Sequence, residues 1–168
     1  HSHFFDPFPN YREDILHGTK AAASGGYTTV MDMPNTDPPV DSPNHFFLKA
    51  KLFAENAVVD YALWGASLPG KADRIAELRR CGCPAFKAFV SDAGPSYPSS
   101  DSFAIFEGMQ AVKAAGGIYA AHAEDQSILD GLRRHYDNQQ WSLTLHDATR
   151  PWYAELSAIS KLLLFAKV

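Results

Sequence analysis

The sequence predicts an α/β fold, a (β/α)8 barrel of which roughly the first half is present. Short β-rich segments alternate with helical ones, an order typical of a parallel sheet covered by helices. Polar residues fall in or just after the predicted strands, where the active sites of such barrels gather. The chain has 168 residues, whereas a full barrel usually needs about 250.

Four segments rich in β-branched, aromatic and small apolar residues predict the strands. The first of them follows Gly25-Gly26 and ends at a Pro-rich loop signal, residues 34–39. The expected strands are residues 27–33, 60–66, 85–90 and 118–122.

The segments between the strands have helical character. One helix precedes Gly25, a suitable C-cap, and another opens at Ser42-Pro43, where Pro is tolerated in the first turn. Residues 92–102 are rich in Pro and Ser and predict a long loop. The expected helices are residues 12–24, 42–56, 71–80, 103–115, 126–136 and 151–167.

Two α/β architectures fit this order, a doubly wound sheet and a barrel. A doubly wound nucleotide-binding sheet requires a Gly-rich turn after its first strand, whereas Gly25-Gly26 comes before a strand. Asn35, Lys87 and His122 lie in or at the ends of strands, which favours the barrel. His1 would end a further strand whose body is absent. We therefore expect residues 1–168 to be one partial barrel domain, truncated at both ends.

Composition and charge narrow the functional classes. With 46% hydrophobic residues and a net charge of -4, the chain is ordinary for a globular protein and lacks the basic surface of a nucleic-acid binder. No apolar run approaches the roughly 20 residues that cross a bilayer, and no signal peptide is visible. Cys81 and Cys83 form no disulfide framework, so we expect a cytoplasmic protein.

His1 and His3 are separated by one residue, so in an extended segment both imidazoles face the same side. Two imidazoles on one side can bind a single metal ion. The spacing alone also fits an incidental pair or the remnant of a tag.

Two later residues, Lys87 and His122, are further candidates for a metal site. Lys87 lies inside an apolar strand, where an ammonium is costly unless it is paired or modified, although at a strand edge it could extend to water. His122 ends its strand and fits either a metal ligand or a satisfied core histidine. The residues alone leave both alternatives open.

Other polar and aromatic residues are better explained by structure. Cys81 and Cys83 have no second pair with which to complete a metal site. Glu124 and Asp125 fit either acid–base chemistry or capping of the next helix. We expect the remaining histidines at the surface and two tryptophans in packing: His17, His45, His135, His146, Trp141 and Trp152.

The order of these residues resembles the cyclic amidohydrolases, which include dihydroorotases, allantoinases and hydantoinases. The resemblance covers essentially the whole chain and is greatest to dihydroorotases. Its most specific stretch, Met33-Pro34-Asn35-Thr36, favours dihydroorotase over hydantoinase. The matching segments are residues 1–4, 12–15, 21–29, 32–39, 86–89, 122–125 and 150–151.

This resemblance implies a hydrolase of pyrimidine biosynthesis that opens a ring amide with the help of two divalent metal ions, expected to be zinc. His1 and His3 would bind one ion and His122 the second. Lys87, carbamylated by carbon dioxide, would bridge the two ions. Asn35 would contact the substrate.

The sequence departs from the dihydroorotase pattern beside the first histidine pair. Phe5 stands where dihydroorotases usually carry an Arg that holds the substrate carboxylate, and a phenyl ring cannot replace that clamp. We therefore expect a neutral or more apolar cyclic amide or imide as substrate. The family's next metal-binding His and its catalytic Asp would lie beyond Val168, so we expect the chain alone to be inactive.

Two functions from different classes follow. The leading one is the metal-dependent hydrolase, whose partner is a small-molecule cyclic amide rather than a nucleic acid or a membrane. The alternative is a non-catalytic, amidohydrolase-like assembly protein, which Phe5 favours and the four retained ligand positions oppose. Half a barrel leaves open sheet edges, which invite pairing. We therefore expect a homo-oligomer or association with the rest of a larger molecule.

Overall fold

The computed structural model describes residues 1–168 as strands and helices that alternate along the chain. The strands are Thr29–Asp32 (β1), Asp60–Leu63 (β2), Gly65–Ala66 (β3), Ala85–Phe89 (β4) and Ile118–His122 (β5). The helices are Ile15–Ser24 (α1), Pro43–Asn56 (α2), Ala72–Arg74 (a 3-10 helix, η1), Ile75–Cys81 (α3), Ser102–Ala114 (α4), Gln126–His135 (α5), Leu143–Thr149 (α6) and Trp152–Phe165 (α7).

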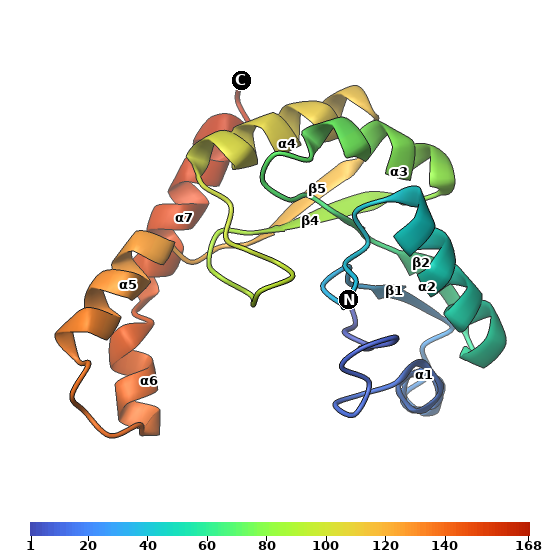
Figure 1. The fold of residues 1–168 in the computed structure, drawn as a ribbon, viewed down its shortest axis with the longest axis horizontal. Coiled ribbons are helices and arrows are strands. Elements are labelled where there is room, and N and C mark those ends of the chain that lie inside the picture. The colour runs from blue at the N-terminus through green and yellow to red at the C-terminus, as the bar shows by residue number, and fades with distance from the viewer.

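The elements form an arc (Figure 1). The strands follow its inner side, and α2, α3 and α4 follow its outer side. The N-terminus lies on the inner side, while α5 and α6 extend from one end of the arc. The predicted α/β architecture is therefore confirmed, with helices covering one face of the strands.

All the strand pairs are parallel. β1 pairs with β2, and β4 lies between β3 and β5, with Lys87 opposite Ala120 and Phe89 opposite His122. Ser2 forms a parallel bridge to Asp32, so the first residues run beside β1. Because parallel strands share one direction, their carboxyl ends meet at one edge, where the predicted site residues lie.

Most sequence-based boundaries are confirmed within a few residues. The predicted strand 60–66 is divided into β2 and β3, because the chain passes from one partner strand to the next. The predicted helix 71–80 begins as η1 before α3, and residues 92–101 form no helix or strand. The short helix α6 was missed because Trp141 to Thr149 shows no strong apolar periodicity.

The main core lies between the helices and the strands. Ile15, Phe53 and Phe86 are fully buried there, with Phe4 packed among them. Gly18 of α1 lies directly against the Phe4 ring, because a Cβ atom at this position would overlap that ring. The close approach anchors α1 to the segment that carries the first two histidines.

Side-chain caps begin most of the helices. Asp14, Ser42, Asp101, Asp125 and Ser142 each accept a hydrogen bond from a backbone N–H in the first turn that follows. Asp125 also joins two helices, since its carboxylate accepts hydrogen bonds from Ser127 of α5 and from Ser157 of α7.

The links of Asp125 predict a pH dependence of stability. The hydrogen bond from the Ser127 hydroxyl, with smaller contributions from Ser157 and Lys161, lowers the pKa of Asp125 in spite of its partial burial. A carboxyl whose pKa is lower in the folded state stabilises the fold above its unfolded pKa, about 3.9, and loses this effect as the pH falls through its folded value. We expect Asp125→Asn to lower the urea midpoint at pH 6.

The difference between the variant and the parent should shrink as the pH falls through the folded-state pKa of Asp125, because protonation then makes both side chains neutral. Asp137→Asn is the control, since Asp137 is exposed in the loop after α5 and forms no ion pair. A difference that stays constant between pH 6 and pH 2.5 would contradict the assigned role of the carboxylate.

The structure tests the expectations about the two tryptophans and the two cysteines. Trp141 and Trp152 are 72% and 73% exposed, so the prediction that they serve in packing is wrong. Trp152 lies on a face of α7 that no element within residues 1–168 covers. Cys81 and Cys83 are both free thiols, as predicted. No helix is long and apolar enough to cross a membrane.

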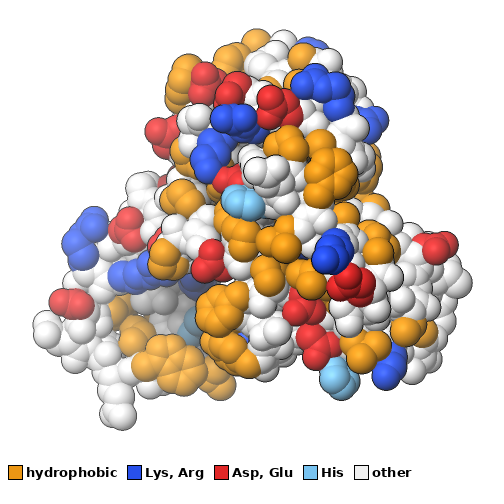
Figure 2. All heavy atoms as spheres, turned by 45° about the vertical axis from the view of Figure 1, so that its right-hand side comes forward, with side chains coloured by type: hydrophobic (Ala, Val, Ile, Leu, Met, Phe, Trp, Pro, Cys, Tyr) orange, Lys and Arg blue, Asp and Glu red, His pale blue; other side chains and the backbone are white.

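Many large apolar side chains are exposed at the surface. Figure 2 shows them gathered over the middle and lower part of one face, between charged side chains. On α7, Leu156, Leu163 and Leu164 are at least half exposed, and at the start of β5 Ile118 is 64% exposed. Open apolar surface of this kind is typical of a domain that packs against further structure. Homo-oligomer formation stays a prediction.

Candidate metal and substrate site

The four predicted metal ligands come from three segments: the N-terminal residues beside β1, strand β4 and strand β5. His1 and His3 flank Ser2, which pairs with the end of β1. Lys87 is the middle residue of β4, and His122 is the last residue of β5. The positive charge of Lys87 acts on His3, so these two groups lie near one another.

His1 and His3 point toward a common position. Their Nε2 atoms are 3.1 Å apart, and the ring centroids are separated by 5.1 Å. Two nitrogens bound to one tetrahedral zinc ion, with Zn–N bonds of about 2.0–2.1 Å, would be roughly 3.3 Å apart. Burial lowers the pKa of His3, as do the charges of Lys87 and Lys49. Neutral imidazole, the form that binds metals, is therefore favoured.

A buried ion pair holds this segment in place. Asp32 Oδ1 accepts hydrogen bonds from the Phe4 backbone N–H at 2.8 Å and from the Ser2 hydroxyl at 3.3 Å. Its other oxygen lies 2.6 Å from Lys49 Nζ, which also donates to the Met33 carbonyl at 2.8 Å. Burial raises the pKa of Asp32 and lowers that of Lys49, while the attraction between the two charges opposes both effects.

Lys87 is buried and has no acidic partner. Every residue of β4 is buried, and Lys87 is 6% exposed. Its Nζ lies 5.1 Å from the centre of the Phe89 ring, a cation–π distance. Burial alone lowers the pKa of Lys87, which favours the neutral amine. The prediction that this lysine lies inside the sheet is confirmed, and the alternative of extension to water is not.

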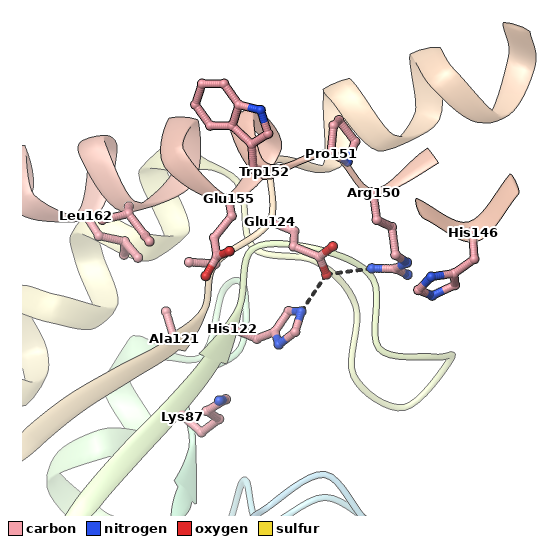
Figure 3. A pocket seen from close by; sticks show the side chains of 12 residues that line it. Lys87, Ala121, His122, Glu124, His146, Arg150, Pro151, Trp152, Glu155 and Leu162 are labelled. Atoms are coloured by element: carbon pink, nitrogen blue, oxygen red, sulfur yellow. Dashed lines mark hydrogen bonds and ion pairs between the residues drawn. The ribbon is translucent and has the colours of Figure 1, made fainter. Parts of the chain in front are cut away.

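His122 is fixed by an acidic residue that the sequence did not single out for this role. Glu124 Oε2 lies 2.6 Å from His122 Nε2 and 2.5 Å from Arg150 Nη1, between the two groups (Figure 3). Burial raises the pKa of Glu124, but His122 and Arg150 outweigh it and hold that pKa below its ordinary value. The His122 ring stacks on Phe89 with centroids 5.6 Å apart. Glu124 orients the imidazole and occupies Nε2, so Nδ1 remains for another partner.

Lys87 and His122 line the same cavity, of about 720 Å³. Glu124, His146 and Arg150 form other parts of its wall (Figure 3). The exposure predicted for His146 is confirmed, and it lies at this cavity rather than on a featureless surface. His17 and His135 are exposed, and His45 is half-buried with Nδ1 2.6 Å from Asp41.

Asn35 lies beside His3 in the loop after β1. Its side chain partly offsets the lowering of the His3 pKa, although its buried Oδ1 has no hydrogen-bond partner of ordinary geometry. A buried carbonyl oxygen without a partner is costly unless something else supplies the donor. Asn35 also lines a second cavity, of about 350 Å³, together with Phe5 and Arg12.

The residues present form two groups rather than a finished metal cluster. Nowhere in residues 1–168 do three or more His, Cys, Asp or Glu side chains come together as ready metal ligands. The histidine pair forms one group, and Lys87 with His122 forms the other. The donor set fits a metal centre because the imidazoles of His1 and His3 converge, and because Lys87, whose pKa is lowered by burial, lines the same cavity as His122.

The sequence did not predict three features of the site: the ion pairs of Glu124, the Asp32–Lys49 pair, and Arg12 over Phe5. Asp125 is the cap of α5, whereas Glu124 forms ion pairs and caps nothing, so only half of the capping explanation is correct. The Asp32–Lys49 pair joins residues that are far apart in the sequence and carry no local signal. Arg12 lies over the Phe5 ring, with Cζ 4.7 Å from its centroid.

Comparisons of the sequence give consistent relatives. No family model matches the chain. It is 38% identical over 170 residues to an allantoinase of Rubrobacter xylanophilus and 35% identical to one of Deinococcus radiodurans, in each case over 99% of this chain. An L-hydantoinase of Paenarthrobacter aurescens is 29% identical over 151 residues. The chain spans 33% to 38% of the length of these relatives.

Solved structures agree with the sequence comparison. The fold matches an L-hydantoinase from Arthrobacter aurescens with a TM-score of 0.95 and 28% identity, over 99% of this chain and 38% of the other. A D-hydantoinase matches with a TM-score of 0.86 at 23% identity, which concerns the fold alone. Over almost its whole length, the chain is therefore homologous to a segment of the cyclic amidohydrolases named allantoinase and hydantoinase.

Proposed function

We propose that the full-length protein is a metal-dependent hydrolase of a cyclic amide. The observation that carries the proposal is the convergence of His1 and His3, together with a buried Lys87 that has no acidic partner and whose charge acts on His3. The names of the relatives support ring amides of the hydantoin and allantoin type. Specificity for dihydroorotate, with a role in pyrimidine biosynthesis, is a narrower proposal that none of these names supports.

The proposed metal centre contains two divalent ions, with zinc as the expected metal. His1 and His3 are the proposed ligands of the first ion, through the pair of nitrogens that already face each other. His122 is the proposed ligand of the second, through Nδ1, since Nε2 is engaged with Glu124. When bound, the ions would lower the pKa of water and polarise the ring carbonyl.

Lys87 is proposed to be carbamylated and to bridge the ions. Its neutral ε-amine attacks the carbon of carbon dioxide, a N–C bond forms, and one proton leaves the nitrogen for solvent. The product is a carbamate with one negative charge and two oxygens, which hard and borderline cations accept as a carboxylate-like ligand. Burial of Lys87 supports this step because it favours the neutral amine that attacks. The carbamate also supplies the acidic ligand that the histidine groups lack.

Other side chains are proposed to orient the metal ligands and to hold the substrate. Glu124 is proposed to accept a hydrogen bond from the Nε2–H of His122, and it also accepts one from Arg150; these contacts fix the imidazole ring and its tautomer. Asn35 is proposed to accept a hydrogen bond from the substrate, because its buried Oδ1 is without a partner. The Asp32–Lys49 pair keeps the histidine segment against β1.

Metal analysis and hydrolysis of a ring-amide panel test the proposal. The purified full-length protein should carry close to two metal ions and hydrolyse at least one of hydantoin, allantoin and dihydroorotate. His3→Gln should lose metal and activity, whereas His17→Gln, on an exposed face of α1, should keep both. A protein with less than about one ion per chain and no hydrolysis would overturn the proposal and favour the non-catalytic assembly protein.

A further inference from the structure

We propose that Tyr97 is a positioning residue for Lys87. Its hydroxyl binds the backbone carbonyl of that lysine and so fixes where the ε-amine lies when it meets carbon dioxide. The inference rests on the proposed function, because it concerns how the proposed bridging ligand is formed. Tyr97 follows Lys87 by ten positions and lies in the loop rich in Pro and Ser, where no local pattern marks it.

The loop that carries Tyr97 connects β4 to α4 and lies on the inner side of the arc (Figure 1). Its middle is a closed turn. The Tyr97 N–H donates to the Gly94 carbonyl at 2.9 Å, and the Ala93 N–H donates to the Tyr97 carbonyl at 3.3 Å. The Asp92 N–H donates to the Gln126 side chain at 2.7 Å, which ties the loop to the start of α5. The tyrosine is therefore held by a turn with hydrogen bonds of its own.

The Lys87 carbonyl accepts two hydrogen bonds. One belongs to the sheet and comes from the Ser67 N–H at 2.8 Å, and the other comes from the Tyr97 hydroxyl at 2.5 Å. A carbonyl oxygen has two lone pairs, so the tyrosine adds a bond without replacing the one in the sheet. Tyr97 is 2% exposed, so its bond is shielded from water. The loop thus fastens the lysine at its own backbone.

The same loop fastens β4 again two residues further on. The Ser100 N–H donates to the Phe89 carbonyl at 2.7 Å, and the Tyr97 ring packs edge-on against the Phe89 ring with centroids 5.0 Å apart. Residues two apart in a strand face the same side, so Lys87 and Phe89 share a face. His122 stacks on that Phe89 ring. The loop therefore holds both residues of β4 whose side chains face the proposed second ion.

Anchoring of the backbone matters for Lys87 because its side chain is weakly held at its far end. A lysine has a flexible four-carbon stem. The Lys87 amine has no acidic partner, and its contact is the face of the Phe89 ring, 5.1 Å from Nζ. The position of the amine therefore depends on how firmly the backbone below it is fixed. Groups that orient a metal ligand in this way typically contribute about 10- to 100-fold to metal affinity or activity.

Zinc loading at graded bicarbonate concentrations tests the inference. The full-length protein is freed of metal by chelation under gas without carbon dioxide and is then reloaded with zinc. Tyr97→Phe removes the hydroxyl and keeps the ring. The variant should need about fivefold more bicarbonate for half-maximal zinc content, the usual effect of one hydrogen bond. The carbon-13 carbamate signal should show the same dependence, and saturating bicarbonate should restore both the zinc content and kcat.

Tyr61→Phe is the matched control. The Tyr61 hydroxyl donates to the Ala50 carbonyl at 3.1 Å, and its ring packs against Phe53 with centroids 4.7 Å apart, so the variant loses a bond of the same kind between β2 and α2. Both variants should lower the urea midpoint, but only Tyr97→Phe should change the bicarbonate dependence.

Equal bicarbonate dependence in the two variants, or a loss of zinc from Tyr97→Phe that bicarbonate does not restore, would overturn the inference. The proposed function would stand in that case, provided that the parent binds zinc and hydrolyses a ring amide. A parent that binds no zinc and gives no carbamate signal would overturn both, so the two failures are distinguishable.

Discussion

Lys49→Met is expected to destabilise the folded protein by about 3–5 kcal/mol, because it leaves a buried carboxylate without its counter-charge. Lys49 and Asp32 are 1% and 0% exposed, and 2.6 Å separates Nζ from Oδ2. The Lys49 ammonium also donates to the Met33 carbonyl, so that acceptor loses its partner as well. Because methionine fills much of the volume of the lysine side chain, the loss of stability measures the missing charge and not the creation of a cavity.

Urea unfolding of the full-length protein measures the effect. Burial already raises the pKa of Asp32 in the parent, and in the variant that pKa should rise further because the attraction of Lys49 no longer opposes the effect of burial. Stability is then greatest below the unfolded pKa and falls as the pH rises through the folded one, so the deficit against the parent should be smallest near pH 4 and larger at pH 7. Lys51→Met is the matched control on the same helix.

Lys51 is exposed and its nearest carboxylate oxygen, on Glu55, lies 3.8 Å away, so its replacement should cost at most about 1 kcal/mol. Equal destabilisation by the two variants would show that the buried pair contributes no more than an exposed one. A stable Lys49→Met protein that loses bound metal would indicate that the pair positions His1 and His3 without determining global stability.

Lys87→Met is expected to have the largest functional effect, namely loss of the bound metal ions and of ring-amide hydrolysis. Replacement of a partner that only supports a metal ligand typically costs about 10- to 100-fold in metal affinity or activity, and a bridging ligand should cost more. In the metal-free state, the stability of the variant should equal or exceed that of the parent, because an unpaired amine in a buried strand is replaced by an apolar side chain of similar length.

Metal content, kcat/KM and the urea midpoint are measured together on the full-length protein. Labelling with carbon-13 bicarbonate should give a carbamate signal in the parent and none in the variant. Lys20→Met, at an exposed position of α1, should leave all of these unchanged. Full metal content and activity in Lys87→Met would rule out the bridging role, whatever the effect on stability.

Much of the candidate site was predictable because its residue types are unusual at their positions. A lysine within five otherwise apolar residues and a histidine at a strand end stand out in a linear sequence, and the structure places both at one cavity. The tryptophans show the opposite case. Trp152 has the composition of a core residue, but its exposure depends on whether another element covers α7, which no local pattern encodes.

By itself the sequence determined the alternation of strands and helices, the parallel order, the place of Lys87 within a strand and that of His122 at a strand end, because periodicity and turn residues act locally. Only the tertiary structure decided which charges meet. Glu124 pairs with Arg150, and Asp32 pairs with Lys49, across separations that the fold alone closes. The physical reason is that the attraction between two charges depends on their distance and burial, and both are properties of the packed chain.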